Sequence, residues 1–254
     1  MKRYAQRGFT LIEMAVVLVI IGLILGAVSI GKDVQRNAEY TKIKQKFVDQ
    51  WASAYNTYTQ RSGVVPGDNQ VAPQLMVNGL NYATASGGDM TAATAPGSIC
   101  HGSKGPNMAR TAQTGADYDL RLMMQRVGVR MPPGRAEGQE DRYIYLDSNG
   151  NPQELQVCFE WNPPGTPSGA GNVMVISGLT PDLARSLDQM IDGKADAQEG
   201  MFREEGVLNG TPNAPGVEWD RYNTNQYAVT QQTAEAKLDE DQVATVIAHY
   251  KMNQ

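Results

Sequence analysis

The sequence holds few of the side chains that usually perform catalysis or bind metals at neutral pH. Its 254 residues include two histidines, His101 and His249, and two cysteines, Cys100 and Cys158. The two cysteines lie too far apart for a metal-binding knuckle or a CxxC redox site. His101 belongs to a loop, where an exposed side chain is expected. No GxSxG, HExxH, P-loop or GxGxxG pattern is present. These absences predict a protein that is not an enzyme and has neither a cofactor nor a metal.

Two acidic segments have spacings that also occur in calcium sites. Residues 147–151, "DSNGN", place oxygen-bearing side chains at alternating positions, but the following glycine and the distant glutamate of a calcium loop are missing. A tight turn is therefore the favoured interpretation. Asp188, Asp192 and Asp196 follow one another four residues apart. For these three we expect a solvated helix end rather than a calcium site.

Basic residues are in the minority. The chain has 22 Lys plus Arg against 27 Asp plus Glu, a net charge of -5. Three of the basic residues, Lys2, Arg3 and Arg7, precede a long apolar segment, and their removal would lower the net charge to -8. Such an acidic product argues against a broad nucleic-acid-binding surface.

Proline is absent before Pro66, and the apolar segment in this region is long. Phe9 to Ile30 is 22 residues with one charge, Glu13. As a helix it would extend about 33 Å, which is enough to cross a bilayer. Because the basic residues lie at its N-terminal side, the rest of the chain should lie outside the cytoplasm.

The two cysteines have different expected states in different compartments. In a reducing compartment they would be two inert buried thiols, and in an oxidising one they could form a disulfide. Export therefore favours a Cys100–Cys158 disulfide, which would constrain the unfolded chain by about 4 kcal/mol.

The carboxylate of Glu13 is costly within an apolar segment and needs a partner. If the chain is cut between Gly8 and Phe9, a new α-amino group appears four residues before Glu13. The ammonium and the carboxylate could neutralise each other within one chain or between neighbours, and between neighbours the pairing would set a register. An ordinary signal peptide, cut after Ser29, would give Glu13 no role.

The segment "RGFTLIEMAVVLVIIG" resembles the processing site of type IV pilins and of the related type II secretion pseudopilins. The matching features are a short basic leader that ends at Gly8, an aromatic Phe9, a glutamate at the fifth mature position (Glu13) and an unbroken apolar helix. The resemblance covers roughly the first 60 residues, so the rest of the chain is interpreted from its own residues.

The resemblance implies cleavage after Gly8 by a prepilin peptidase, N-methylation of Phe9 by the same kind of enzyme, and docking of subunits through Glu13. Its expected partners are that peptidase and methyltransferase, other pilin or pseudopilin subunits, and inner-membrane lipid before assembly. The protein would cross the inner membrane once with its C-terminal head in the periplasm, and would then enter a pilus or pseudopilus at the cell surface.

One position departs from the family pattern. Many pilins carry a helix-bending proline where this chain has Ile30, so local melting of the helix would have to use Gly22, Gly26 and Gly31. The GxxxG spacing of Gly22 and Gly26 also allows close approach of a second helix. Alternatively, these glycines are merely tolerated in a membrane helix.

Beyond the apolar segment the chain keeps a helical period. Tyr40, Ile43, Phe47, Trp51, Ala54 and Tyr58 recur at helical spacing, and Ser62-Gly63 followed by "VVPGD" is a stop signal. We therefore predict four parts: a leader over residues 1–8, a membrane or filament-core helix over 9–30, its amphipathic continuation over 31–62, and a globular head over 63–254.

The head is predicted to be α+β. Residues 142–161 alternate around Asn149-Gly150 as a β-hairpin does, "NVMVIS" is a third strand, and Thr180 caps a helix that runs to residue 192. A short helix is predicted over 116–127, loops over 83–98 and 209–228, and an amphipathic helix over 234–251. The whole chain is thus expected to have a pilin-like fold, in which a long N-terminal helix carries a head with a small antiparallel sheet.

The function favoured by these features is that of a structural filament subunit. The length of the mature chain, residues 9–254, favours a minor pilin of a type IV pilus-like filament over a major one. A type II secretion pseudopilin is the alternative, because both groups share the motif. A conventionally secreted or membrane-anchored binding protein is the second alternative.

Overall fold

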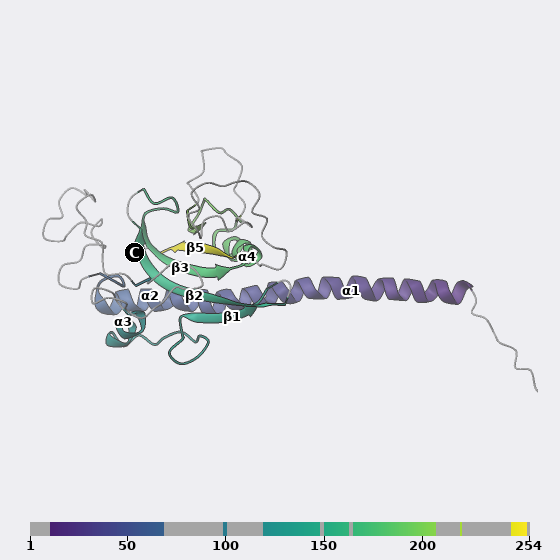
Figure 1. The fold of residues 1–254 in the computed structure, drawn as a ribbon, viewed down its shortest axis with the longest axis horizontal. Helices are drawn as coiled ribbons and strands as arrows, with labels where there is room; N and C mark the ends of the chain where they lie inside the picture. The colour runs from purple at the N-terminus through teal and green to yellow at the C-terminus, as the bar shows by residue number, and fades with distance from the viewer. Residues whose placement is uncertain are drawn as a thin grey trace, which may run out of the picture. The chain divides into compact units, whose positions relative to one another are not determined.

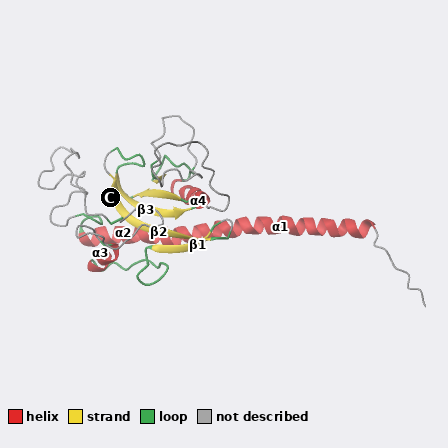
Figure 2. Ribbon diagram, in the orientation of Figure 1, coloured by secondary structure: helices red, strands yellow, loops and turns green. Residues whose placement is uncertain are grey.

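The fold was analysed in a computed structural model that describes residues 11–68, 99–100, 119–147, 150–162, 165–206, 219 and 245–252. The chain divides into two compact units, Met1–Thr41 and Lys42–Gln254. A long N-terminal helix, a small antiparallel sheet and further helices form the α+β, pilin-like fold that the sequence predicts (Figures 1 and 2).

The N-terminal helix runs without a break from Leu11 to Ser62. It comprises α1 (Leu11–Ile43), a π-helical turn η1 (Lys44–Val48) and α2 (Asp49–Ser62). The predicted end at Ser62 is confirmed: Gly63 adopts a left-handed conformation with φ of 78°, and its N–H donates to the carbonyl of Thr59. The predicted start at Phe9 lies outside the described residues.

The π-helical turn was not predicted, because the apolar spacing alone is compatible with a regular helix. A π turn adds a residue to one turn of the helix, and here Phe47 and Val48 are both fully buried. Lys44 spans the turn and donates to Asp49 at 2.9 Å. The six predicted stripe residues are all buried, which confirms the amphipathic period: Tyr40, Ile43, Phe47, Trp51, Ala54 and Tyr58.

The head contains a five-stranded antiparallel sheet with the order β1-β2-β3-β5-β4. Its strands are β1 (Arg142–Leu146), β2 (Pro152–Asn162), β3 (Gly171–Leu179), β4 (Phe202–Glu204) and β5 (Val246–Lys251). The predicted hairpin is confirmed: Tyr143 pairs with Leu155, and Gly150 takes a φ of 86° in the turn. The predicted third strand is confirmed as β3.

The prediction of a helix over Ala234–Lys251 is wrong at its C-terminal end. Residues 246–251 form β5, which lies between β3 and β4, while 234–244 lie outside the described residues. The spacing of Val246, Ile247 and Tyr250 fits a helix, but a short apolar segment does not distinguish a helix from a buried strand. Val246–Ala248 are buried, and both edges of β5 have a partner strand. The neighbours that favour a strand are therefore remote in sequence.

Two shorter helices belong to the head. α3 (Leu120–Arg126) begins at Asp119, whose side chain accepts from the N–H of Leu122. The predicted helix from 116 is confirmed in this part, and residues 116–118 lie outside the described residues. α4 (Pro181–Asp192) begins at Thr180 as predicted, and Gly193 ends it with a φ of 77°.

Aromatic side chains join α2 and η1 to the sheet. The ring of Phe159 on β2 lies 6.0 Å from Trp51 and 5.1 Å from Tyr55, and Phe47 lies 5.4 Å from Tyr143 on β1. α4 packs near β4 and β5, at the other edge of the sheet. The core of the head is therefore formed between helices and one sheet.

One buried hydroxyl joins β1 to the connection between β3 and α4. Tyr145 donates to the carbonyl of Gly178 and accepts from the N–H of Thr180, both at 3.0 Å. We expect Tyr145→Phe to lower the free energy of unfolding by about 1–3 kcal/mol, because two buried backbone groups lose their partner. Denaturant unfolding of the full chain in detergent micelles, followed by circular dichroism, measures the change.

Tyr143→Phe is the matched control for this change. Tyr143 lies two residues away on the same strand, and its hydroxyl makes no hydrogen bond within the described residues. Its loss should change the free energy of unfolding by less than about 0.5 kcal/mol. Equal stability of the two variants would contradict the role of the Tyr145 hydroxyl.

Candidate functional site

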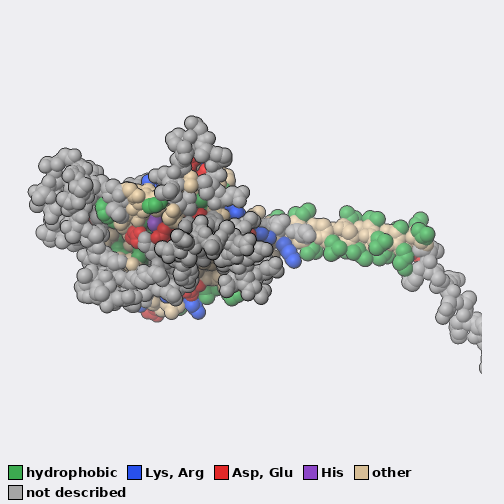
Figure 3. Space-filling view, turned by 45° about the horizontal axis from the view of Figure 1, so that its top comes forward, with side chains coloured by type: hydrophobic (Ala, Val, Ile, Leu, Met, Phe, Trp, Pro, Cys, Tyr) green, Lys and Arg blue, Asp and Glu red, His purple; other side chains and the backbone are tan. Residues whose placement is uncertain are grey.

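The N-terminal motif places one carboxylate on an exposed apolar helix. Glu13 lies in the first turn of α1, while Gly8 and Phe9 lie outside the described residues. Between Leu11 and Gly31, Glu13 is the single charged residue. Hydrophobic side chains cover this part of the helix (Figure 3). Leu11, for example, is 89% exposed.

This exposure is unfavourable in water, since apolar area costs about 25 cal/mol per Å² when it is not buried. The helix is long and apolar enough to cross a membrane. None of the residues in its most apolar stretch of 18 is buried within the structure. The apolar side chains are therefore available to lipid or to helices of other molecules.

Gly22 and Gly26 have no packing role within the described part of the chain. A Cβ atom added at either position would meet no atom within 4 Å. Neither position therefore needs a glycine to avoid a clash with the described residues. It leaves a small-residue surface on α1 that could accept a second helix.

The predicted disulfide is present. Cys100 and Cys158 are bonded across a sequence separation of 58, with their Cα atoms 5.5 Å apart. Cys158 lies on β2, so the bond attaches residue 100 to the sheet. Both residues are buried. His101, expected to be exposed, lies outside the described residues.

The second histidine, His249, takes part in a buried polar cluster that the sequence did not reveal. Its Nδ1 lies 2.6 Å from the hydroxyl of Ser168 and 3.1 Å from Nδ2 of Asn162. Its Nε2 lies 3.8 Å from a carboxylate oxygen of Glu205. These residues are spread from 162 to 249 in the sequence. They come together because residues 246–251 form strand β5 rather than the predicted helix.

This combination of serine, histidine and glutamate does not make a nucleophile. Ser168 is 0% exposed, so a substrate could not reach its hydroxyl. The hydroxyl and the Asn162 amide both point to Nδ1, which leaves the ring proton on Nε2, on the side of Glu205. We assign the cluster a structural role in joining β2, β5 and the loop before β3.

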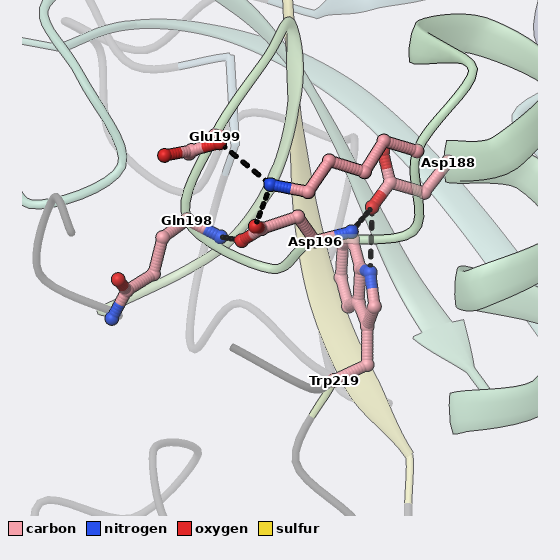
Figure 4. Close-up of polar contacts among 6 residues, drawn as sticks. Asp188, Asp196, Gln198, Glu199 and Trp219 are labelled. Atoms are coloured by element: carbon pink, nitrogen blue, oxygen red, sulfur yellow. Dashed lines mark hydrogen bonds and ion pairs between the residues drawn. The ribbon is translucent and has the colours of Figure 1, made fainter. Parts of the chain in front are cut away.

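Two of the three acidic residues predicted to form a solvated helix end, Asp188 and Asp196, are buried, so the prediction is wrong for them, while Asp192 is partly exposed. Asp188 is 0% exposed and Asp196 is 2% exposed. One oxygen of Asp188, Oδ2, accepts from the N–H of Asp196 at 2.7 Å and from the indole N–H of Trp219 at 2.8 Å (Figure 4). Trp219 is remote in sequence, and no local pattern could have shown this contact.

The other two carboxylates are held by different donors. Asp192 accepts from the backbone N–H groups of Met201 and Phe202 at 2.8 and 2.9 Å. Asp196 accepts from the N–H of Gln198 and pairs with Lys194 at 2.8 Å (Figure 4). The three residues therefore close the α4–β4 connection onto α4.

Within the described residues, no group of three His, Cys, Asp or Glu side chains could hold a metal ion. In the 147–151 turn, Asp147 accepts from the N–H of Asn151 and from the amide of Gln153, as expected for a turn. Asn149 lies outside the described residues. The site residues that the structure describes thus divide into an apolar helix with one acid and a head closed by buried polar groups.

Burial raises the pKa of Asp188 from 3.8 to about 7. The hydrogen bonds from Trp219 and Asp196 act in the opposite direction, while the neighbouring Asp192 carboxyl raises the pKa further. Asp188 is consequently protonated in acid and ionised in alkali, with the change close to neutral pH.

Comparison with known protein families finds a match at the N-terminus. Residues 3–29 match the family model described as the prokaryotic N-terminal methylation motif, the signature of type IV pilins and pseudopilins. No curated protein and no solved structure matches the chain. The match spans Gly8, Phe9, Glu13, Gly22 and Gly26, and ends before the head.

The disulfide leads to a test of stability and thiol content. In protein unfolded without reductant, we expect neither Cys100 nor Cys158 to react with an alkylating reagent, and both to react after reduction. Cys100→Ala with Cys158→Ala should lower the free energy of unfolding by about 2–5 kcal/mol, because the unfolded chain regains freedom. Alkylation of both thiols in the unreduced protein would contradict the bond.

Proposed function

We propose that the chain is a structural subunit, a minor pilin, of a type IV pilus-like filament, cleaved after Gly8 and N-methylated at Phe9. The single observation that carries the proposal is that Glu13 places one carboxylate on an otherwise apolar, exposed helix within the matched motif. Such a helix needs other molecules to cover it.

The chemistry of the motif supports docking between subunits. Cleavage would remove Lys2, Arg3 and Arg7 and create a positive amine at Phe9, while the apolar helix stays attached to the head. In an apolar environment a carboxylate costs several kcal/mol, so Glu13 gains from an ammonium group on a neighbour. Because only one acid occurs on this surface, the pairing also sets the axial position of each incoming subunit.

The remaining features fit a filament subunit. Gly22 and Gly26 open the helix surface to a second helix, and the Cys100–Cys158 disulfide suits a head in the periplasm. Before assembly the helix would cross the inner membrane once. The extent of the head, residues 63–254, favours a minor pilin, because a bulky subunit is tolerated where few copies are incorporated.

A type II secretion pseudopilin is the second candidate. It shares the matched motif and would be processed by the same kind of peptidase and methyltransferase. Location distinguishes the two candidates: a pilin copurifies with sheared surface filaments, whereas loss of a pseudopilin stops secretion of folded exoproteins. A secreted or anchored binding protein would instead start near Ile30 or keep its leader.

The mature N-terminus gives a direct test of the proposal. We expect intact-mass and peptide mass spectrometry of the protein from its own host to show a chain that starts at Phe9 and carries one methyl group on its amine. Substitution of Gly8 by a bulky residue should leave the leader attached, because cleavage follows Gly8. A chain that starts after Ser29 would support a conventional signal peptide and would refute the proposal.

Substitution of Glu13 tests its role in docking. We expect Glu13→Val to insert into the membrane normally but to enter filaments at least about tenfold less well, since the amine of the neighbour loses its partner. Quantitative immunoblots of membrane and sheared-filament fractions measure this ratio. Glu39→Gln, which removes a charge from the same helix outside the apolar segment, is the matched control. Normal incorporation of Glu13→Val would show that Glu13 is not the docking group.

A further inference from the structure

The contact between α4 and Trp219 involves two neighbouring carboxyl groups, Asp188 and Asp192, and no donor within the described residues reaches Oδ1 of Asp188. From these contacts we propose that buried Asp188 and its partly exposed neighbour Asp192 form a proton-binding pair that attaches Trp219 to the head in acid and weakens this attachment as the pH rises. The proposal concerns the head alone and does not depend on filament assembly.

The arrangement of donors around Asp188 is one-sided. Both of its hydrogen-bond donors, the Asp196 N–H and the Trp219 indole, reach the same oxygen, Oδ2. Its other oxygen, Oδ1, is buried, and no donor within the described residues reaches it. The adjacent Asp192 supplies a carboxyl group, whose Oδ2 already accepts two backbone N–H groups.

A proton satisfies this arrangement. Two carboxylates cannot hydrogen bond to each other, but a carboxylic acid can donate to a carboxylate. If Asp188 is protonated on Oδ1, it can donate to Asp192 while Oδ2 continues to accept from Trp219. The same proton also removes the negative charge of Asp188, which lowers the cost of burying this side chain.

The nearby cations do not neutralise the two carboxyl groups in place of this proton. Lys194 is exposed and pairs with Asp196 and Glu199. On α4 itself, Arg185 pairs with Asp182. Neither cation forms an ion pair with Asp188 or Asp192 in the described part of the chain.

The strands packed against α4 contribute further titratable groups. From β4 these are Arg203, which donates to the Gly200 carbonyl, and the buried Glu204. From β5 they are Tyr250, whose pKa is raised by burial and then by Asp49 and Asp192, together with its neighbours His249 and Lys251. None of these groups forms an ion pair with the two acids in the described residues, and Tyr250 stays neutral below its raised pKa.

The two acids contribute to the position of Trp219 in different ways, Asp188 directly and Asp192 through Phe202. Asp188 accepts the indole N–H, and Asp192 fixes the backbone N–H of Phe202, whose ring lies 5.3 Å from that of Trp219. Phe202 in turn packs against Tyr250 at 6.1 Å. Trp219 is buried, so its release would expose the indole and solvate Asp188 together.

The sign of the pH dependence follows from linkage. The closed form holds the Asp188 proton with a pKa of about 7, whereas a solvated aspartate has its ordinary value of 3.8. The closed form is therefore favoured fully below pH 3.8, and this advantage is lost as the pH rises to about 7. The ratio of open to closed form should rise about tenfold per pH unit across this range and become constant above it.

The test uses the full chain in detergent micelles with ¹⁵N-labelled tryptophan. The indole N–H signal of Trp219 is assigned through its loss in Trp219→Phe, and its position and hydrogen-exchange rate are followed from pH 5 to pH 8.5. We expect the signal to titrate with a midpoint near 7. Between pH 5 and pH 6.5, its exchange rate relative to Asp188→Asn should rise about tenfold per pH unit.

Three variants test whether a proton on Asp188 controls the Trp219 signal. Asp188→Asn keeps one acceptor for Trp219 and supplies a donor toward Asp192, so its signal should not titrate. Asp192→Asn, which serves if Asp188→Asn fails to fold, should lower the midpoint because the opposing carboxyl is gone. Asp182→Asn on the same helix should titrate as the wild type does.

Several outcomes would overturn the proposal. These are a midpoint below pH 5, no titration up to pH 8.5, or titration of Asp188→Asn with the wild-type midpoint. A calcium titration at pH 7.5 tests whether the two carboxyl groups bind a cation instead of a proton. If Ca²⁺ alone restores the low-pH signal of Trp219, the pair binds a cation rather than a proton, and the proposal is wrong.

Discussion

A single helix has to satisfy two different environments, and most of the structure follows from that constraint. In α1 the side chains from Leu11 to Val28 are exposed and only Glu13 among them is charged, while η1 and α2 bury an aromatic stripe. The stripe requires a partner that presents large rings at matching positions, which β2 supplies through Phe159. The sheet is therefore organised around the contact of Trp51 and Tyr55 with Phe159, and the remaining strands extend outward from β2.

The parts that could be predicted are those with local causes. A turn glycine between alternating residues predicts the β1–β2 hairpin, and a threonine before proline predicts the start of α4. β5 could not be predicted, because its pairing with β3 and β4 involves residues far away in the chain. The burial of Asp188 depends in the same way on Trp219, and the His249 cluster depends on Ser168 and Asn162. In each case a distant residue determines the environment of a local pattern.

The N-terminal motif and the head are constrained in different ways. The motif over residues 3–29 is recognisable because its residues stand at the spacings that a family model describes. The head has no match among curated proteins or solved structures, so its properties follow from its own contacts. Glu13 and Asp188 illustrate the contrast. Both are carboxyl groups, but Glu13 lies on an exposed apolar helix, whereas Asp188 lies buried inside the head next to a second acid.

Different forces hold the described residues around the sheet, and they differ in their response to the solvent. Cys100 is attached by a covalent bond to Cys158, which changes with redox conditions but not with moderate pH. β5 is attached through backbone hydrogen bonds to two strands, which do not titrate. Trp219 is attached through a carboxyl group whose ionisation lies close to neutral pH. A change of pH near neutrality should therefore act on Trp219 first, because the sheet and the disulfide leave the rest of the head in place.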